Sequence, residues 1–244
     1  MNSIFLTGTA GSGKSQLTSR LTDSFIQNDK EVIAVNLDPG VNNLPYSADI
    51  DIRDFININE IMEKYNLGPN GAVILAADLI ASKIDEINDT IQTYNPDYVF
   101  FDTPGQIELF AFRTSGPFFV QNIYGEGRAN IFLCDSTLIS KPENFVSIAL
   151  LASSIKLQLK IPQICVLSKQ DLINNKNLLK WAEDPTEIFN NLPKNGEMYD
   201  LTSRIASNLL ESDLFDELIP VSSMNNQGIV EITALLSRIL TRGD

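Results

Sequence analysis

Near its N-terminus the chain reads Gly8-Thr9-Ala10-Gly11-Ser12-Gly13-Lys14-Ser15, which fits the pattern G-x-x-x-x-G-K-[S/T] of phosphate-binding loops. The apolar run at 3–7 before it predicts a buried strand, and leucine and phenylalanine recur at helical spacing through 16–26 after it. Glycines between a strand and a helix let the backbone wrap closely around phosphate and aim N–H groups at its oxygens. The stretch therefore predicts a nucleoside triphosphate site, in preference to a glycine-rich turn with an exposed lysine.

Two side chains of this loop have expected roles. Lys14 should reach the β- and γ-phosphates, and the Ser15 hydroxyl should ligate Mg²⁺. The N-terminus of the following helix adds a favourable positive potential for an anion. The residues expected to bind the nucleotide at this end of the site are Gly11, Ser12, Gly13, Lys14, Ser15 and Gln16.

The composition limits the class of protein. The 244 residues are 43% hydrophobic, enough for one large α/β domain, and the net charge of −13 argues against nucleic acid and anionic membranes as general partners. The absence of histidine excludes histidine-based acid–base chemistry and histidine metal ligands. Cys134 and Cys165 each lie in an apolar run, which indicates buried free thiols in a reducing cytosol rather than a disulfide or metal site. No apolar stretch approaches ~20 residues and no signal peptide is evident, so we expect a cytoplasmic protein without a membrane span.

Strand-like runs alternate with helical patterns along the chain. The expected strands are 3–7, 31–37, 98–102, 130–134, 163–167 and 217–221. The expected helices are 16–27, 57–65, 73–93, 143–159, 178–190, 200–212 and 229–240. This alternation predicts an α/β fold with a mainly parallel sheet and helices on both faces, the three-layer architecture of P-loop NTPases. We expect one domain over 1–244 with helical insertions at about 44–95 and 174–212, and ligands beyond the carboxyl ends of the strands.

The predicted strand 98–102 ends in an acid and a turn, Asp102-Thr103-Pro104-Gly105-Gln106, which has the D-T-x-G pattern of GTPase switches. Asp102 is expected to hold Mg²⁺ directly or through water. The Gly105 N–H is expected to contact the γ-phosphate, so that loss of this phosphate releases the loop. The pattern is also a good turn sequence, but its place at a strand end after a phosphate loop favours the switch.

A second polar turn, Ser168-Lys169-Gln170-Asp171, follows the predicted strand 163–167 and resembles the guanine-reading motif N-K-x-D. The Asp171 carboxylate is able to accept from guanine N1–H and N2–H₂, whereas adenine has no donors there and would leave a buried carboxylate without partners. Lys169 is expected along the base plane, and Ser168 replaces the usual asparagine. The alternative is a solvated, charged loop. The segment Val221-Ser222-Ser223, at the end of the last predicted strand, is expected to present backbone N–H groups to the base, Ser223 among them.

The predicted strand 31–37 is followed by Asp38, Pro39 and Gly40. An acid at this strand end is expected to face the Mg²⁺ and γ-phosphate region. Two interpretations stay open for Arg53, which lies among the acids of 49–54: a phosphate or dimer contact, or a surface ion pair with its neighbours.

Taken together, these residues resemble the GPN-loop GTPases. The stretch Leu67-Gly68-Pro69-Asn70-Gly71 contains the tripeptide that gives the family its name, although alone it would indicate only a helix–loop–helix turn. The chain departs from the family at Gly40, where alanine is expected, and from many GTPases at Ser168. The resemblance extends in the family's order from residue 3 to about 225, and it rests on Gly8–Ser15, Asn36–Pro39, Leu44–Tyr46, Asp51–Arg53, Leu67–Gly71, Asp102–Gln106 with Glu108, and Ser168–Asp171.

The resemblance implies a homodimeric GTPase of the SIMIBI class, with two nucleotides near the dimer interface. It further implies that the GPN loop of one subunit reaches the other's active site, where Asn70 contacts the transferred or product phosphate. Gly68 and Pro69 would give this loop a tight and rigid approach.

The expected reaction is hydrolysis of GTP to GDP and phosphate, which depends mostly on positioning and charge stabilisation. Ser15, Asp38 and Asp102 are expected in or next to the Mg²⁺ shell. Gln106 and Glu108 are expected to orient the attacking water, with Asp38 as a competing candidate for that role.

Two other functional classes stay open. An ATPase or small-molecule kinase would use the same phosphate loop, and only Asp171 and its context argue for guanine. A nucleotide-driven switch or assembly factor would hydrolyse slowly and act through partner binding. The family's association with RNA polymerase assembly suggests such partners by analogy alone. The short chain resembles the compact archaeal members of the family.

Overall fold

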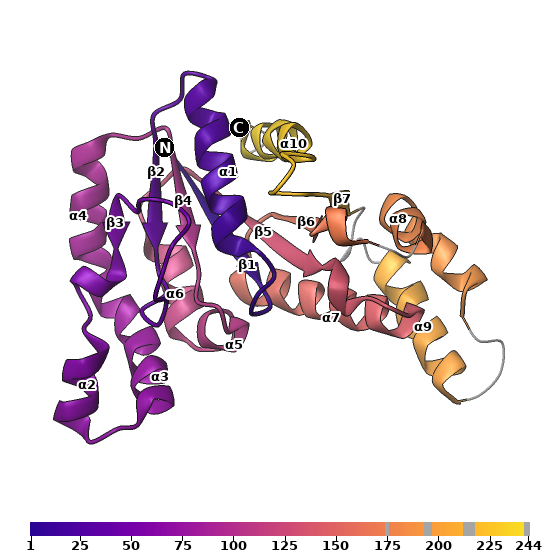
Figure 1. Ribbon diagram of the computed structural model, residues 1–244, viewed down its shortest axis with the longest axis horizontal. Helices are drawn as coiled ribbons and strands as arrows, with labels where there is room; N and C mark the ends of the chain where they lie inside the picture. The colour runs from indigo at the N-terminus through magenta and orange to yellow at the C-terminus, as the bar shows by residue number, and fades with distance from the viewer. Residues whose placement is uncertain (174–175, 193–196, 212–217, 242–244) are drawn as a thin grey trace.

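One sheet of parallel strands organises the molecule (Figure 1). The computed structural model describes residues 1–173, 176–192, 197–211 and 218–241. In these residues the sheet has seven strands in the order β3-β2-β4-β1-β5-β6-β7, and every neighbouring pair runs parallel. The strands are β1 (Asn2–Gly8), β2 (Val32–Asn36), β3 (Ile50–Asp51), β4 (Tyr98–Asp102), β5 (Gly127–Asp135), β6 (Gln163–Ser168) and β7 (Ile219–Pro220).

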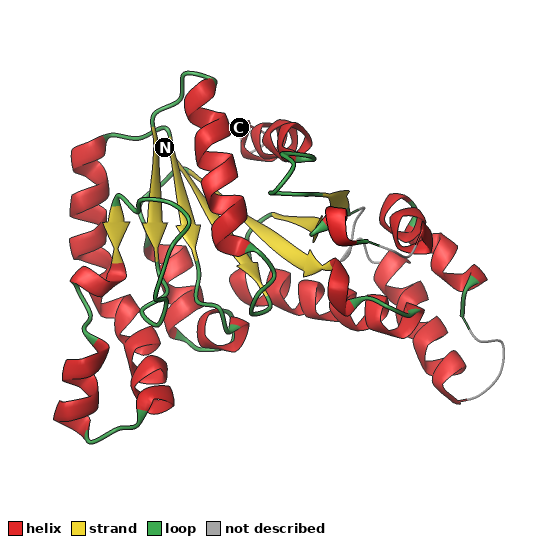
Figure 2. Cartoon of the chain, viewed as in Figure 1, coloured by secondary structure: helices red, strands yellow, loops and turns green. Residues whose placement is uncertain are grey.

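Helices cover both faces of the sheet, as Figure 2 shows. Alternate residues of a strand point to opposite faces, so Ile4 and Leu6 of β1 enter one core whereas Phe5 enters the other. The first core is closed by α1 (Lys14–Gln27) and α10 (Ile229–Thr241). The second, larger core includes residues of α2 (Ile58–Tyr65), α3 (Pro69–Leu79), α4 (Ile84–Tyr94), α5 (Ile107–Phe110), α6 (Ser115–Asn122), α7 (Pro142–Leu159), α8 (Lys176–Glu183) and α9 (Glu197–Glu211).

The predicted α/β class is confirmed, and the strands are apolar because helices bury both of their faces. The expected strands all occur, and so do the helices expected over 16–27, 57–65, 143–159, 200–212 and 229–240, with ends that differ by a few residues. Two expectations reach outside the described residues: Glu217 at the start of the last strand and Ser212 at the end of the helix over 200–212. The same holds for parts of the predicted insertion at about 174–212, namely 174–175, 193–196 and 212.

Some predicted boundaries were wrong. The helix expected over 73–93 begins earlier, because Pro69 takes the first helical position where its missing N–H costs nothing, and it changes to a 3₁₀ turn at Ile80–Lys83 before α4. The helix expected over 178–190 ends at Glu183, because Pro185 cannot continue it and Asp184 caps a new 3₁₀ segment. The short elements β3, α5 and α6 were not predicted.

Within the described part of the chain, no single helix has both the length and the apolar composition needed to cross a membrane. The segments Ile58–Tyr65 and Pro69–Tyr94 meet that requirement only in combination, and they are bent by 111° relative to each other.

Candidate active site

The phosphate loop joins the end of β1 to the start of α1, as predicted. Its glycines are required: Gly11 and Gly13 have φ angles of 74° and 98°, in the left-handed region that residues with a Cβ avoid. A Cβ on Gly8 would lie 2.8 Å from the carbonyl oxygen of Leu133. Gly13 caps α1 without a side chain, so the first N–H groups of the helix are left for an anion.

Lys14 lies at the centre of the site. Its Nζ donates to the carbonyl oxygens of Gly8 and Thr9 at 3.1 Å each and to that of Gly105 at 3.4 Å. Burial lowers the pKa of Lys14, while the carboxylates of Asp102 and Asp38 act to raise it. The ammonium group therefore joins the phosphate loop to the loop that follows β4.

Asp102, at the end of β4, is 2% exposed. Burial raises the pKa of its carboxyl to about 6, against the opposing effects of the Ser15 and Tyr46 hydroxyls and of Lys14. The Tyr46 hydroxyl donates to Oδ2 at 3.0 Å, whereas the buried Oδ1 has no well-formed hydrogen bond among the described residues. The hydroxyls of Thr9 and Ser12 are likewise buried without partners in that part of the chain. Buried polar groups are normally satisfied, so these atoms indicate a place for a polar ligand.

Asp38 links two loops at the same edge of the sheet. Its Oδ1 accepts from the N–H of Gly40 and its Oδ2 from the N–H of Gly105, both at 2.9 Å. The Gly105 N–H, predicted to contact the γ-phosphate, thus already donates to a carboxylate. A negatively charged oxygen is the kind of acceptor that a phosphate would supply at this position.

The oxygen atoms of Asp102 and Ser15 are suitable ligands for Mg²⁺. No group of three or more Asp, Glu, His or Cys side chains that could hold a metal occurs in the described residues. Mg²⁺ is usually bound through one or two carboxylates, waters and substrate phosphates rather than by an all-protein cage. The unpartnered Oδ1 of Asp102, with the Ser15 hydroxyl beside it, suits that mode.

Gln106 and Glu108 lie at the start of α5, where Gln106 is the N-cap and Glu108 is in the first turn. Both side chains are exposed, and among the described residues neither forms a hydrogen bond or an ion pair. They are therefore placed next to Gly105 with freedom to reorient.

The loop after β6 forms the opposite end of the site. Lys169 has a left-handed backbone and its ammonium pairs with Asp135 at 2.6 Å. Asp171 is exposed, and its Oδ1 accepts from the Ser222 hydroxyl at 2.6 Å. The Ser168 hydroxyl is buried and donates to the carbonyl of Cys134 at 3.2 Å, so it anchors the start of the loop to β5.

The segment that contains Ser223 lies beside this loop. The N–H of Gln170 donates to the carbonyl of Val221 at 2.9 Å, which joins the two segments. Arg20 of α1 donates from Nε to the carbonyl of Ser223 at 2.9 Å and fixes the second segment from the other side.

The sequence predicts no role for Tyr46 or Asp135, although each contacts a predicted site residue. Asp135 gave a usable signal, because it ends a buried strand as Asp102 does. Tyr46 lies in the Leu44–Tyr46 stretch on which the resemblance rests, but nothing in the sequence connects it to Asp102, which is 56 positions away. The Ser222 backbone N–H, expected to face the base, donates to the carbonyl of Gln227 at 3.1 Å, and the Ser222 hydroxyl is the group that contacts Asp171.

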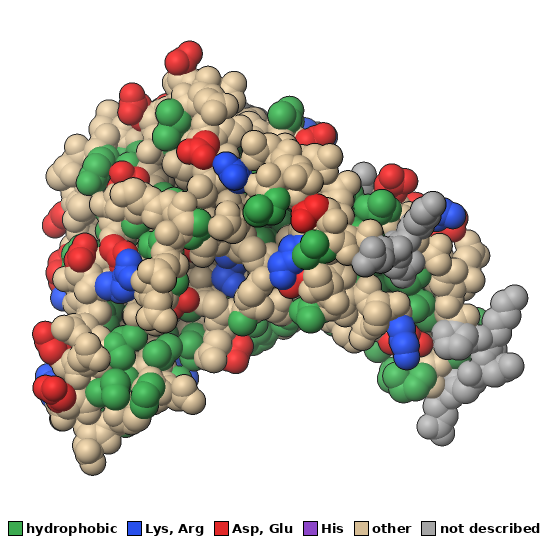
Figure 3. Space-filling model, in the orientation of Figure 1, with side chains coloured by type: hydrophobic (Ala, Val, Ile, Leu, Met, Phe, Trp, Pro, Cys, Tyr) green, Lys and Arg blue, Asp and Glu red, His purple; other side chains and the backbone are tan. Residues whose placement is uncertain are grey.

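The GPN turn, Gly68-Pro69-Asn70, lies at the outer end of the α2–α3 hairpin, apart from the phosphate loop at the start of α1 (Figure 1). Gly68, Pro69 and Asn70 are exposed, and the Asn70 side chain has no hydrogen bond within the described residues. Figure 3 shows hydrophobic side chains gathered over this hairpin, where Tyr65 and Ile74 are 49% and 39% exposed. The fold of one chain thus leaves Asn70 outside the site assembled around Lys14.

Two arginines near the site form ion pairs. Arg53 pairs with Asp51 at 2.6 Å, and its Nη1 donates to the carbonyl of Val41 at 3.0 Å. The ion-pair interpretation of Arg53 therefore describes its contacts in this chain.

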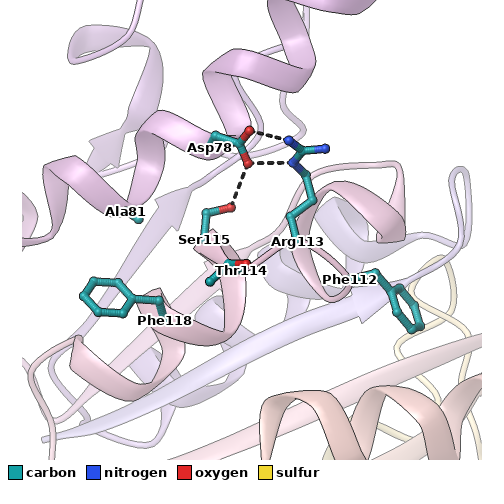
Figure 4. Close-up of a pocket in the computed structure, with 7 residues that line it drawn as sticks. All are labelled: Asp78, Ala81, Phe112, Arg113, Thr114, Ser115 and Phe118. Atoms are coloured by element: carbon teal, nitrogen blue, oxygen red, sulfur yellow. Dashed lines mark hydrogen bonds and ion pairs between the residues drawn. The ribbon is translucent and has the colours of Figure 1, made fainter.

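The second arginine lies beside a depression of about 600 Å³ between α3 and the α5–α6 segment (Figure 4). Arg113 donates through two nitrogens to the carboxylate of Asp78, and Ser115 approaches the same carboxylate. Arg113 lies just after α5, the helix that follows the Asp102 loop, and Asp78 lies in α3, the helix that begins at the GPN turn. The pair therefore links the α5–α6 segment to α3.

Comparison with known proteins gives consistent results. Residues 6–242 match the model of a family described as "Conserved hypothetical ATP binding protein". The chain is 32% identical to GPN-loop GTPase 1 of Dictyostelium discoideum over 93% of its own length and 59% of that protein's. It is 30% identical to GPN-loop GTPase 3 of Kluyveromyces lactis over 97% of this chain and 90% of that one. The crystal structure of a GTPase in apo form from Pyrococcus abyssi is similar with a TM-score of 0.85 and 29% identity, covering 98% of this chain and 97% of that chain. The chain thus spans less than two thirds of the Dictyostelium relative.

Proposed function

The chain belongs to the GPN-loop GTPase family, and from this membership we propose that it binds GTP and hydrolyses it to GDP and phosphate in the presence of Mg²⁺. One observation carries the proposal. A complete phosphate loop, Asp102 with an unpartnered oxygen and the Lys169–Asp171 loop all lie at the carboxyl edge of one parallel sheet. Ligands of such sheets bind at that edge.

The residues around Lys14 would bind and stabilise the phosphates. Backbone N–H groups of Gly11–Ser15 and the Lys14 ammonium supply positive charge to the β- and γ-phosphate oxygens. Ser15 and Asp102 would hold Mg²⁺, with Asp38 beside them, and the ion when bound would neutralise charge that develops on the transferring group. Gly105 would turn its N–H from Asp38 to the γ-phosphate, which makes this loop sensitive to the presence of that phosphate.

The attacking water would be oriented by Gln106 or Glu108, which stand unbonded at the start of α5. Asp38 is the competing candidate, and in the present geometry both of its oxygens accept backbone N–H groups. Phosphoryl transfer needs no strong general base, so any of the three could act by positioning alone.

Guanine is the proposed base because of Asp171. The Ser222 hydroxyl donates to Oδ1 of this exposed carboxylate at 2.6 Å, which limits its rotation. A carboxylate held in one orientation binds a base with two adjacent N–H donors more tightly than a base that has none there. An ATPase or small-molecule kinase is the second candidate, and the family description as ATP binding favours it.

The proposed assembly is a homodimer in which Asn70 enters the partner's site. The exposed GPN turn and the apolar surface of the α2–α3 hairpin support this proposal. We infer one domain over 1–244, a cytoplasmic location, and a role as a nucleotide-driven switch or assembly factor. Protein partners of the RNA polymerase assembly type rest on analogy with the family alone.

The test is steady-state hydrolysis of GTP and ATP with Mg²⁺ over a series of protein concentrations. We expect selective turnover of GTP. Specific activity that rises with concentration, together with a monomer-to-dimer change in light scattering, would indicate a site completed by a second subunit. Preference for ATP would contradict the proposed role of Asp171 and favour the ATPase or kinase class.

A further inference from the structure

A strap of nine residues, 41–49, connects the loop after β2 to β3 without helix or strand. Both of its ends are held. The Asp49 side chain and N–H bond the backbone of Ala34 at 2.8 and 2.9 Å, and Arg53 donates to the carbonyl of Val41 at 3.0 Å. The middle of the strap carries Tyr46, which belongs to the Leu44–Tyr46 stretch but has no role predicted from the sequence.

Tyr46 is half-buried and directs its hydroxyl into the candidate active site. Oη donates to Oδ2 of Asp102 at 3.0 Å, across 56 positions of the chain. The phenol is thus a hydrogen-bond donor to a carboxylate that is itself buried.

The two oxygens of Asp102 consequently differ. Oδ2 is occupied by Tyr46, and Oδ1 is buried with no well-formed hydrogen bond in the described part of the chain. A carboxylate held by one oxygen has its other oxygen fixed in direction. Outer hydrogen bonds of this kind orient metal ligands and raise their affinity.

We propose that Tyr46 is a positioning residue for divalent cation binding: it holds Asp102 so that Oδ1 faces the Mg²⁺ position, and it makes the 41–49 strap respond to the bound ion. The inference rests on the proposed function, because it assumes that Mg²⁺ accompanies the nucleotide. It goes beyond that function by assigning a residue outside the nucleotide motifs to the metal.

The test compares Tyr46→Phe with the unchanged full-length chain. Release of GDP carrying a fluorescent methylanthraniloyl group is measured by stopped flow against Mg²⁺ concentration, which reports the ion without any hydrolysis. We expect the half-saturating Mg²⁺ concentration to rise roughly tenfold in Tyr46→Phe. GDP affinity in EDTA should stay the same, since the hydrogen bond found for the phenol in the described residues goes to Asp102 and not to the phosphate loop.

Tyr94→Phe is the matched control. The Tyr94 hydroxyl also donates to the strap, to the carbonyl of Asp49 at 3.3 Å, but it does not touch Asp102. A merely structural tether would make the two variants alike, whereas the proposal predicts a shift only for Tyr46→Phe. In an Asp102→Asn background, Tyr46→Phe should cause no additional shift, because the phenol acts through that carboxylate.

Each outcome is decisive. An unchanged Mg²⁺ dependence in Tyr46→Phe, or an equal loss of GDP affinity with Mg²⁺ and with EDTA, would overturn the inference while leaving the proposed function intact. GDP release from the unchanged chain that ignores Mg²⁺ would overturn the proposed function and this inference together. If Tyr46→Phe folds poorly, amide hydrogen exchange of the unchanged chain provides the test. Exchange in 41–49 should be slower with GDP and Mg²⁺ than with GDP and EDTA. Equal exchange rates would contradict the coupling between the strap and the ion.

Discussion

Asp102 and Asp135 end the two strands that flank β1, and both are buried, yet their carboxyls behave differently. Burial raises the pKa of Asp102 to about 6, because its partners only partly offset the loss of water. At Asp135 burial also acts to raise the pKa, but hydrogen bonds from Lys169 and Thr137 outweigh it and leave the pKa lowered. A buried carboxylate with both oxygens bonded is a structural partner, whereas one with an open oxygen retains capacity for a ligand.

The proposed base-reading role of Asp171 gives a prediction for one residue. Asp171→Asn replaces one acceptor oxygen by an N–H₂ donor, so guanine N1–H or N2–H₂ meets a donor instead of an acceptor. We expect the preference for GTP over ATP to fall by about 10- to 100-fold, the cost of one mispaired polar group. Displacement of fluorescent GDP by each nucleotide measures this preference.

Asp89→Asn is the control for that substitution. Asp89 is exposed on α4, and its substitution by asparagine removes the same charge at a position away from the site. An Asp171→Asn protein with undiminished GTP preference would exclude Asp171 from base recognition.

At the scale of elements, the segment between β4 and β5 packs the helices that follow the Asp102 loop against one another and against α3. α5 is a single turn, and α6 begins directly against it, because a Cβ on Gly116 would lie 1.9 Å from the carbonyl oxygen of Phe110. The Arg113–Asp78 pair joins the same segment to α3. Exposed pairs of this kind add little stability, so the close backbone contact at Gly116 is the feature that sets the packing.

Gly116→Ala is therefore expected to destabilise the fold by about 1–3 kcal/mol, because the backbone of Phe110 has no flexible end that could yield. Gly71→Ala is the matched comparison: its Cβ would meet only the Leu67 side chain, at an ordinary 3.5 Å. Gly71 lies inside α3, so alanine should be neutral or stabilising by up to about 1 kcal/mol. Urea unfolding of both variants measures the free energies, and equal stability would contradict the packing argument.

At the scale of the whole molecule, the loops after β1, β2, β4 and β6 meet at one edge of the sheet, while the GPN turn stands apart from them. The chain carries a net charge of −13, so the backbone N–H groups around Lys14 form a local positive region on an acidic protein. Asn70 is exposed and lies outside the site of its own chain, as expected if a second copy of the chain supplies this residue to the active site.

Two inactive variants test that completion. Lys14→Ala should not bind the phosphates, and Asn70→Ala should bind GTP normally but turn over about 10²-fold more slowly, as expected for the loss of one charge-stabilising donor. In a mixed dimer, the intact phosphate loop of the Asn70→Ala subunit would receive Asn70 from the Lys14→Ala subunit. Random exchange should restore about one quarter of the unchanged activity, because roughly half of the dimers are mixed and each has one complete site.

The mixture is made by co-expression or by refolding the two variants together, and GTP turnover is compared with the mean of the separate proteins. Activity that stays at this mean would place Asn70 in its own subunit's site or outside catalysis.

Local patterns were sufficient for the parallel α/β fold and the phosphate loop. Strand, glycine turn and helix lie within about thirty residues of one another there, so short-range spacing and backbone preference decide their structure. The same holds for the strand ends Asp102 and Ser168, which place polar residues at the carboxyl edge of any parallel sheet.

Only the tertiary structure decided how the loops at that edge contact one another. Asp38 meets Gly105 across 67 positions, Tyr46 meets Asp102 across 56, and Asp171 meets Ser222 across 51. These pairs follow from the strand order β2-β4-β1-β5-β6 and from the path of irregular segments over it. Hydrophobic periodicity specifies that a segment is a strand, but it does not specify which neighbour the strand takes, so the partners of Asp102 and Asp171 had to come from the folded molecule.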